Sequence, residues 1–228
     1  MYDILSNIFI TAALCALFYG TDRVITRAGL QNPYYAVHAL HNAAIVATTA
    51  SDVVATFRHI AAPAGLAAFT NNVLAIQLCF ALHIYHTIAY WQKFRFDDWL
   101  HHVLMVAVAL PIGCIYESRT LVGYSLFFTT GLPGGIDYAC LFAVRNGWMG
   151  RLTEKRINEM LNVWIRSPGC VSQAAFTAAY VAAFSDGTAV AALPLIPALL
   201  NYWNGQYFMG QVVRDLARLE GDKKQGAD

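Results

Sequence analysis

Long apolar stretches separated by short polar breaks dominate the chain. A helix that spans a bilayer needs roughly 20 apolar residues, with about 17 as a lower limit. Seven stretches meet or nearly meet this length, at approximately residues 5–20, 34–57, 72–91, 99–116, 120–143, 170–185 and 188–210. The pattern predicts an all-α polytopic membrane protein with seven transmembrane helices.

The polar breaks predict the orientation of these helices. Thirteen of the 15 lysines and arginines lie after the first, third and fifth stretches or in the C-terminal tail, whereas the opposite side holds only Arg58 and Arg119. Cytoplasmic loops carry an excess of Lys and Arg. We therefore expect the N-terminus outside and the C-terminus in the cytosol. The expected organisation is a first helix with its cytosolic loop (1–33), a six-helix membrane domain (34–211) and a cytosolic tail (212–228).

Composition agrees with a membrane protein. Hydrophobic residues make up 57% of the chain and charged residues 13%, whereas soluble domains carry about 25% charged residues. A net charge of +1 gives no basic field that would attract nucleic acid. The five cysteines are scattered singly through apolar stretches and form no CxxC pair, which favours small core residues. The N-terminal stretch lacks a positive leader, so we expect a retained first helix.

Two segments depart from a regular spanning helix. The sequence RLTEKRINEMLNVWIRSPG alternates charged with apolar residues and predicts an amphipathic helix along the cytosolic membrane surface, or else an ordinary connecting helix. The sequence GLPGGIDY, residues 131–138, contains Pro133 and three glycines, which make a regular helix unexpected. Broken backbone in a membrane is tolerated where it is buried in protein or faces a cavity. A functional cavity and a packing kink both remain open.

Six of the seven histidines lie in or beside the predicted spans. With a rise of 1.5 Å per residue, all six fall roughly 3–12 Å inside the cytosolic ends of their helices. Polar groups in a membrane usually face the interior of a helix bundle. We therefore predict one internal cavity on the cytosolic side, lined by His38, His41, His83, His86, Asp98, Gly134 and Asn204.

Three interpretations of this polar layer are open. In the first, His101 or His102 acts as a base or nucleophile that Asp98 or Asp137 orients. In the second, the HALH, HIYH and DDWLHH segments bind a metal, although short HxxH pairs are weak motifs and we assign no metal ligand. In the third, the histidines only join helices. The candidate catalytic residues are His101, His102 and Asp137. Asp52 lies apart, as a functional acid or a helix-packing residue.

The segment HIYHTIAYWQKFRFDDWLHHVLMVAVALPIG resembles the TLC-domain family, which includes ceramide synthases and non-enzymatic lipid-related proteins. The later NEMLNVWIRSPG also fits, so the resemblance covers residues 35–210 approximately. It implies six helices around a lipid-accessible cavity, preceded by an additional helix. In ceramide synthases a histidine pair, matched here by His101 and His102, belongs to the site where acyl-CoA acylates a sphingoid amine. The family's His-Asp-x-x-Asp segment is replaced here by Thr130 to Gly134, which argues against acyl transfer.

These observations lead to three functional hypotheses. The first is a lipid-binding or lipid-homeostasis membrane protein. The second is a lipid-modifying enzyme, either an N-acyltransferase that uses acyl-CoA or a metal-dependent lipid hydrolase or hydroxylase. The third is an accessory subunit of a larger membrane complex. The expected partners are membrane lipids and, for the third hypothesis, other membrane subunits, with no nucleic acid. The residues themselves specify no cofactor. Residence in the endoplasmic reticulum or another endomembrane is implied only by the resemblance.

Overall fold

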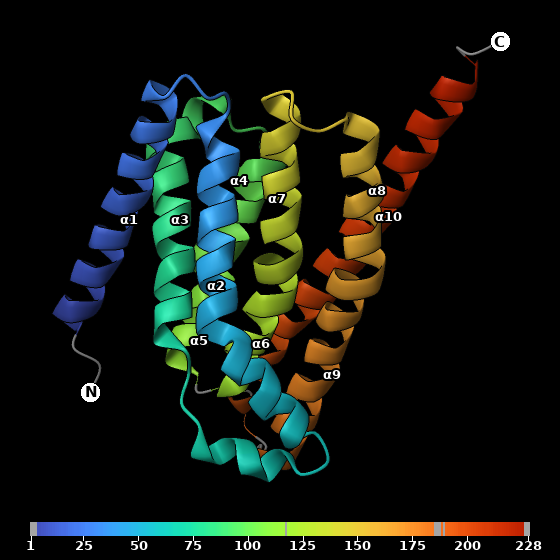
Figure 1. Cartoon of the computed structure of the whole chain (residues 1–228). Helices are drawn as coiled ribbons and strands as arrows, with labels where there is room; N and C mark the ends of the chain where they lie inside the picture. Colours follow the sequence, from blue (N-terminus) through green and yellow to red (C-terminus); the bar gives the residue numbers. More distant parts are fainter. Residues whose placement is uncertain (1–3, 117, 185–187, 189, 226–228) are drawn as a thin grey trace.

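The computed structural model describes residues 4–116, 118–184, 188 and 190–225, and within this part of the chain the regular structure is helical, with no strand (Figure 1). The predicted break at Ser185 to Gly187 lies outside the described residues. The long helices pack side by side and reverse direction at each connection. The elements are α1 (Ile4–Arg27), α2 (Pro33–Arg58), η1 (Pro63–Ala68), α3 (Val73–Tyr90), η2 (Trp91–Lys93), α4 (Phe96–Val103), η3 (Leu104–Ala109), α5 (Leu110–Ile115), α6 (Thr120–Leu126), η4 (Phe127–Gly131), α7 (Leu132–Arg145), α8 (Arg151–Leu161), η5 (Asn162–Arg166), α9 (Ser167–Phe184), η6 (Val190–Ala192) and α10 (Leu195–Gln225).

Among the described residues, four helical stretches are long and apolar enough to cross a membrane: Leu5–Arg27, Val73–Lys93, Phe96–Ile115 and Thr120–Arg145. Large apolar side chains point outward from such helices. Leu5 and Phe9 on α1, for example, are 78% and 75% exposed. Extended apolar surface is rare on soluble monomers and is typical of a surface that contacts membrane. The all-helical, membrane-compatible character that the sequence predicts is therefore confirmed at this level.

Helix α2 lies at the centre of the bundle, between α1 and α3 on one side and α6 and α7 on the other (Figure 1). Its buried face carries Val37 and Ile45, but also polar residues such as Asn42, Thr49 and Thr56. A helix surrounded by protein can carry such groups because its neighbours satisfy them. Its central place explains how α2 can bury polar residues within an apolar bundle.

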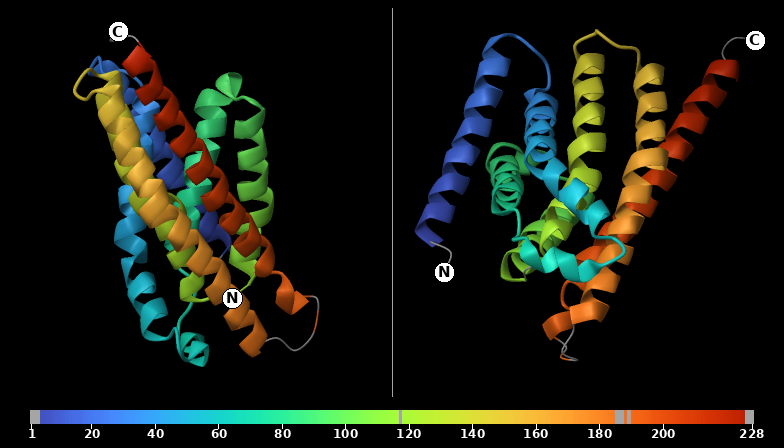
Figure 2. Two further views of the ribbon diagram at one scale, coloured as in Figure 1. Left: turned by 90° about the vertical axis from the view of Figure 1, so that its right-hand side faces the viewer. Right: turned by 60° about the horizontal axis from the view of Figure 1, so that its bottom comes forward.

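Helix α10 packs along α8 and α9 over much of their length, as both views in Figure 2 show. Helices α8, η5 and α9 follow one another without a break from Arg151 to Phe184. The amphipathic segment is therefore a continuation of α9, which corrects the prediction of a separate surface helix. Its polar residues Glu154, Asn158 and Asn162 are buried because they face neighbouring helices.

The glycine- and proline-containing segment at 131–138 is helical, contrary to the expected break. The π-helical stretch η4 leads without a break into α7, and the Thr129 carbonyl, four residues before Pro133, accepts a hydrogen bond from Nε of Arg166 at 2.9 Å in place of the missing N–H. A Cβ on Gly134 would lie 2.8 Å from Nδ2 of Asn42, and a Cβ on Gly131 would lie 3.1 Å from Cγ2 of Ile45. The glycines thus permit the close approach of α2 and α7, which favours the packing explanation.

Candidate functional site

Helices α2, α3 and α4 bring five histidines together at the end of the bundle where α1 connects to α2. The Nε2 atoms of His83 and His101 lie 3.2 Å apart. The ring centroids of His38 and His86 are stacked at 4.1 Å. His102 completes the group, with its ring 5.0 Å from that of His83 and 5.9 Å from that of His86. We call these five residues the histidine cluster: His38, His83, His86, His101 and His102.

Three members of the cluster each make the same type of hydrogen bond to the backbone of their own helix. Nδ1 of His38, His83 and His102 donates to the carbonyl oxygen four residues earlier, at 2.7, 2.7 and 2.8 Å. A carbonyl oxygen only accepts hydrogen bonds, so each Nδ1 carries the proton and each neutral ring presents a lone pair at Nε2. In the contact between His83 and His101, the Nε2 of His101 is accordingly the donor.

The cluster contains more acceptors than it satisfies. The Nε2 atoms of His86 and His102 are buried and have no hydrogen-bond partner among the described residues. A buried polar atom without a partner costs free energy, of order 1–3 kcal/mol. For His102 the vacant atom is a lone pair, because its proton is on Nδ1. The site therefore favours a ligand that donates hydrogen bonds, such as a hydroxyl or an amine.

Aromatic rings enclose the cluster. Tyr34 lies against His38 and His86 with ring centroids at 4.0 and 4.7 Å. Tyr138 of α7 stacks on His38 at 4.2 Å, and Phe94 lies 4.5 Å from His102. These rings help to bury His38, His86 and His102, where polar contacts are strengthened, whereas His101 is exposed.

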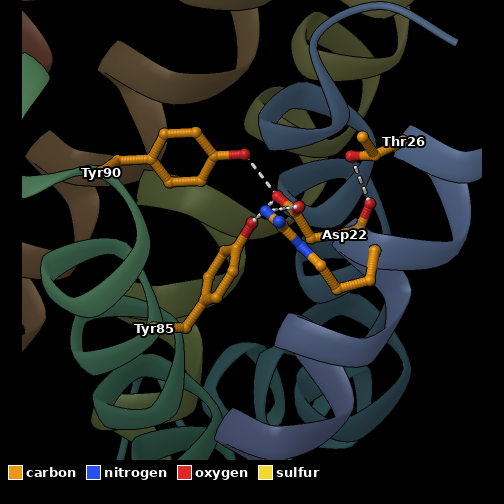
Figure 3. Close-up of polar contacts among 5 residues, drawn as sticks. Asp22, Thr26, Tyr85 and Tyr90 are labelled. Carbon is orange, nitrogen blue, oxygen red and sulfur yellow. Dashed lines mark hydrogen bonds and ion pairs between the residues drawn. The ribbon is translucent and has the colours of Figure 1, made fainter.

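Asp22, at the end of α1, is a buried acid that the sequence analysis missed (Figure 3). Its side chain is 0% exposed, and Oδ2 accepts hydrogen bonds from the hydroxyl of Tyr85, at 2.5 Å, and from that of Tyr90. Arg23 pairs with Oδ1 at 2.8 Å. The arrangement ties α1 to α3 beside His86, which follows Tyr85. The sequence does contain a signal for this position: the apolar residues Val24 and Ile25 follow Asp22 and indicate that the first helix continues beyond its predicted end at residue 20.

The predicted carboxylate partners do not reach the histidines. The Asp98 side chain accepts from the backbone N–H of Arg95 at 2.9 Å and thus caps α4. Asp137 has Arg166, Glu154 and Lys155 as charged neighbours, which places it toward α8 and η5. The histidines of the cluster consequently have no described carboxylate to orient them, and backbone carbonyls do so instead.

The remaining predicted cavity residues lie apart from the cluster. His41 turns toward α1, where its ring lies 5.8 Å from that of Phe18, and its Nδ1 contacts Oδ1 of Asn42 at 2.9 Å. Gly134 packs against Asn42. Asn204 is half-buried on α10, and among the described residues no hydrogen bond or ring contact joins it to the cluster.

Asp52 belongs to a packing contact between helices. Its Oδ2 accepts a hydrogen bond from Nδ2 of Asn72 at 2.9 Å, and Asn72 also caps α3 through Oδ1 and the N–H of Ala75. The second and third helices are joined there, at the end of the bundle opposite the cluster. The helix-packing interpretation of Asp52 is the one that this geometry favours.

In the described part of the chain, no group of three or more His, Cys, Asp or Glu side chains is arranged to hold a metal ion. The HALH pair in particular does not converge, because His38 faces the cluster and His41 faces Phe18.

The chain matches no protein-family model, no curated protein and no solved structure. The TLC resemblance therefore stays a prediction, and the functional inference rests on the residues and their geometry.

Proposed function

We propose that the chain is a seven-helix integral membrane protein that binds a lipid and holds its polar headgroup at the histidine cluster. The carrying observation is the pair of buried, unpartnered Nε2 atoms on His86 and His102. A lipid headgroup with hydroxyl or amine groups would supply the missing donors. This role fits a lipid-binding or lipid-homeostasis protein of the TLC type.

The proposed seven spans add α2, the continuous α8–α9 helix and α10 to the four apolar stretches. The described chain begins and ends at opposite ends of the bundle, as an odd number of crossings requires (Figure 1). The connections at the cluster end carry most of the basic residues, including Arg27, Lys93 and Arg151. By the positive-inside rule this end faces the cytosol, or an equivalent compartment.

A lipid is favoured over a soluble ligand because the cluster lies within helices whose outer surfaces are apolar. Ile88 and Val103, close in sequence to cluster residues, are 64% and 54% exposed. Their side chains present an apolar surface to which acyl chains can pack while the headgroup reaches the imidazoles.

A second candidate function is N-acyl transfer from acyl-CoA to an amine, which the lone pair on His102 favours. As the amine attacks the acyl carbonyl it loses a proton, which a positioned imidazole can accept; the thioester C–S bond then breaks, and coenzyme A leaves as a thiol that takes this proton. Here the Asp98 carbonyl would fix the His102 ring through Nδ1, at 2.8 Å, and Nε2 would face the substrate. His101 would support the site through its contact with His83.

The test is to purify the full chain in a mild detergent, extract the bound lipid and identify it by mass spectrometry. We expect stoichiometric lipid in the natural protein and a loss of about tenfold or more in His86→Leu and His102→Leu, because each removes a buried ring nitrogen that would contact the headgroup. His59→Leu is the matched control, since His59 lies at the far end of α2, where its ring contacts Phe69.

Two results would contradict the proposal. One is natural protein that carries no lipid and takes up none from mixed vesicles. The other is equal lipid retention in all three variants. N-acyl transfer is tested separately, with long-chain acyl-CoA and a long-chain amino alcohol; an unchanged rate in His102→Leu would exclude His102 as the base.

A further inference from the structure

A second polar site lies between α7 and α8, near their connection and apart from the histidine cluster. It is a pocket of about 330 Å³ lined by Leu141, Val144, Arg145, Arg151, Glu154 and Lys155. Asp137 precedes Leu141 by four residues and Arg145 by eight, so all three lie on the same face of α7. The pocket therefore joins the two arginines to Glu154, and Asp137 lies further along the same face of α7, outside the pocket lining.

The inner part of the pocket carries a buried carboxylate, Glu154, that has one neighbouring cation but an unfilled hydrogen-bonding position. Glu154 is 1% exposed, and its Oε1 has no hydrogen-bond partner among the described residues. The nearest cation is Nζ of Lys155, at 3.6 Å. Oδ1 of Asp137 is also buried without a partner. Burying carboxylates is costly unless positive charge and hydrogen-bond donors compensate them.

The rim of the pocket carries the opposite charge. Arg145 ends α7 and Arg151 begins α8, and both are exposed. Neither forms an ion pair with a described residue. The first turn of a helix also favours anions through its free N–H groups. A simple anion would be repelled by the buried carboxylates, and a simple cation by the two arginines.

We propose that this pocket binds a phospholipid headgroup that combines a phosphate with a primary ammonium group, as in phosphatidylethanolamine. The phosphate contacts Arg145 and Arg151 at the rim, and the ammonium group donates to Glu154 below them. A quaternary ammonium has no N–H to donate, so phosphatidylcholine fits less well. Leu141 and Val144 offer apolar surface beside the headgroup. This site is independent of the lipid proposed at the histidine cluster.

Of the two rim arginines, Arg145 is the one that does not line a second pocket containing acidic residues. Arg151 and Lys155 also line a neighbouring pocket with Asp215 and Asp222 of α10, so their charge is shared. Arg145 lines the pocket between α7 and α8 and does not line this neighbouring pocket. Substitution of Arg145 accordingly tests the phosphate contact, and substitution of Glu154 tests the ammonium contact.

The experiment uses the full chain, delipidated in detergent, with equal amounts of dioleoyl phosphatidylethanolamine, phosphatidylcholine and phosphatidylglycerol. Native mass spectrometry measures the bound lipid. We expect phosphatidylethanolamine to bind about tenfold more tightly than the other two, from one charge-assisted hydrogen bond. Glu154→Gln should abolish that preference, whereas Arg145→Gln should weaken all three lipids. Glu159→Gln, on the same helix but outside the pocket, should change nothing.

Equal binding of the three lipids by the natural protein would overturn the proposal, as would a preference that persists in Glu154→Gln. If Glu154→Gln fails to fold, the comparison of the three lipids in the natural protein and the effect of Arg145→Gln still test the proposal. Free phosphoethanolamine that binds as tightly as the lipid would overturn the lipid assignment. His86→Leu and His102→Leu should keep the preference, which separates a failure here from a failure at the histidine cluster.

Discussion

The histidine cluster and the amide network around Asn201 are buried in the same bundle, but their hydrogen bonds are completed to different degrees. Nδ2 of Asn201 donates to Oγ of Ser125 and Oε1 of Gln173 at 3.1 and 3.0 Å, and Oδ1 accepts from the Thr129 hydroxyl at 2.5 Å. Arg166 extends this network by donating to the Thr129 carbonyl and to Oδ1 of Asn162, at 2.9 and 3.1 Å. The histidine cluster instead keeps two buried nitrogens without partners.

This difference separates two uses of polar residues in an apolar bundle. A complete network joins helices, because each group finds its partner in a neighbouring helix. The amide network joins α6, η4, α9 and α10 in this way. An incomplete cluster costs stability unless something else completes it, and such a cost is typical of binding sites. The complete amide network has the character of a structural contact, and the incomplete histidine cluster agrees with the ligand site proposed above.

The largest expected loss of stability follows from breaking the complete network. Asn201→Leu removes the hydrogen bonds to Ser125, Thr129 and Gln173 and a weaker one from the Cys170 thiol, and it leaves partners on α6, η4 and α9 unsatisfied. At about 1 kcal/mol for each bond in a membrane bundle, the loss is about 3 kcal/mol. Thermal unfolding in detergent measures it as a lower midpoint. Asn204→Leu, three residues later on the same helix, is the matched control; a similar midpoint for the two variants would contradict the structural assignment.

An intermediate loss is expected at Asp22, where a carboxylate accepts two tyrosine hydroxyls. Asp22→Asn keeps the shape and one acceptor oxygen, but it removes the charge that strengthens the hydrogen bonds from Tyr85 and Tyr90. We expect a loss of about 1.5 kcal/mol, the lower value for hydrogen bonds to a charged group. The thermal midpoint measures it against Asp97→Asn, an exposed acid of α4. An equal midpoint in these two variants would show that the contact between α1 and α3 does not depend on the carboxylate.

The position of a histidine in the sequence predicted its depth along the bundle better than the side of the helix on which it lies. Helix rise placed six histidines at one level, but residues three apart differ by about 60° around a helix, so His38 and His41 can face different neighbours. Asp137 lies toward α8 because the packing of α7 determines which of its sides faces the histidines, and sequence position alone does not give that side. Composition predicted the apolar helices because hydrophobic runs of that length have few alternatives.

Other features depended on tertiary contacts that a local pattern does not contain. The polar residues Thr21 to Arg23 suggested a loop, yet α1 continues to Arg27 because Tyr85 and Tyr90 complete the hydrogen bonds of Asp22. The amphipathic segment suggested a surface helix, yet Glu154 and Asn158 are buried beside other helices. At Asp22 the partners that compensate the polar group are distant in sequence, whereas Glu154 and Asn158 are buried by the packing of neighbouring helices.

The smallest expected loss of stability belongs to the incomplete cluster. His102→Leu removes an imidazole whose Nε2 has no described partner, so the substitution also removes an unsatisfied buried atom. The lost contact from Nδ1 to the Asp98 carbonyl is offset by apolar packing against Phe94, and we expect a change within about 1 kcal/mol. Lipid retention should fall sharply in the same protein. A midpoint lowered as far as in Asn201→Leu, in delipidated protein, would show that the histidines hold the bundle together rather than serve a ligand.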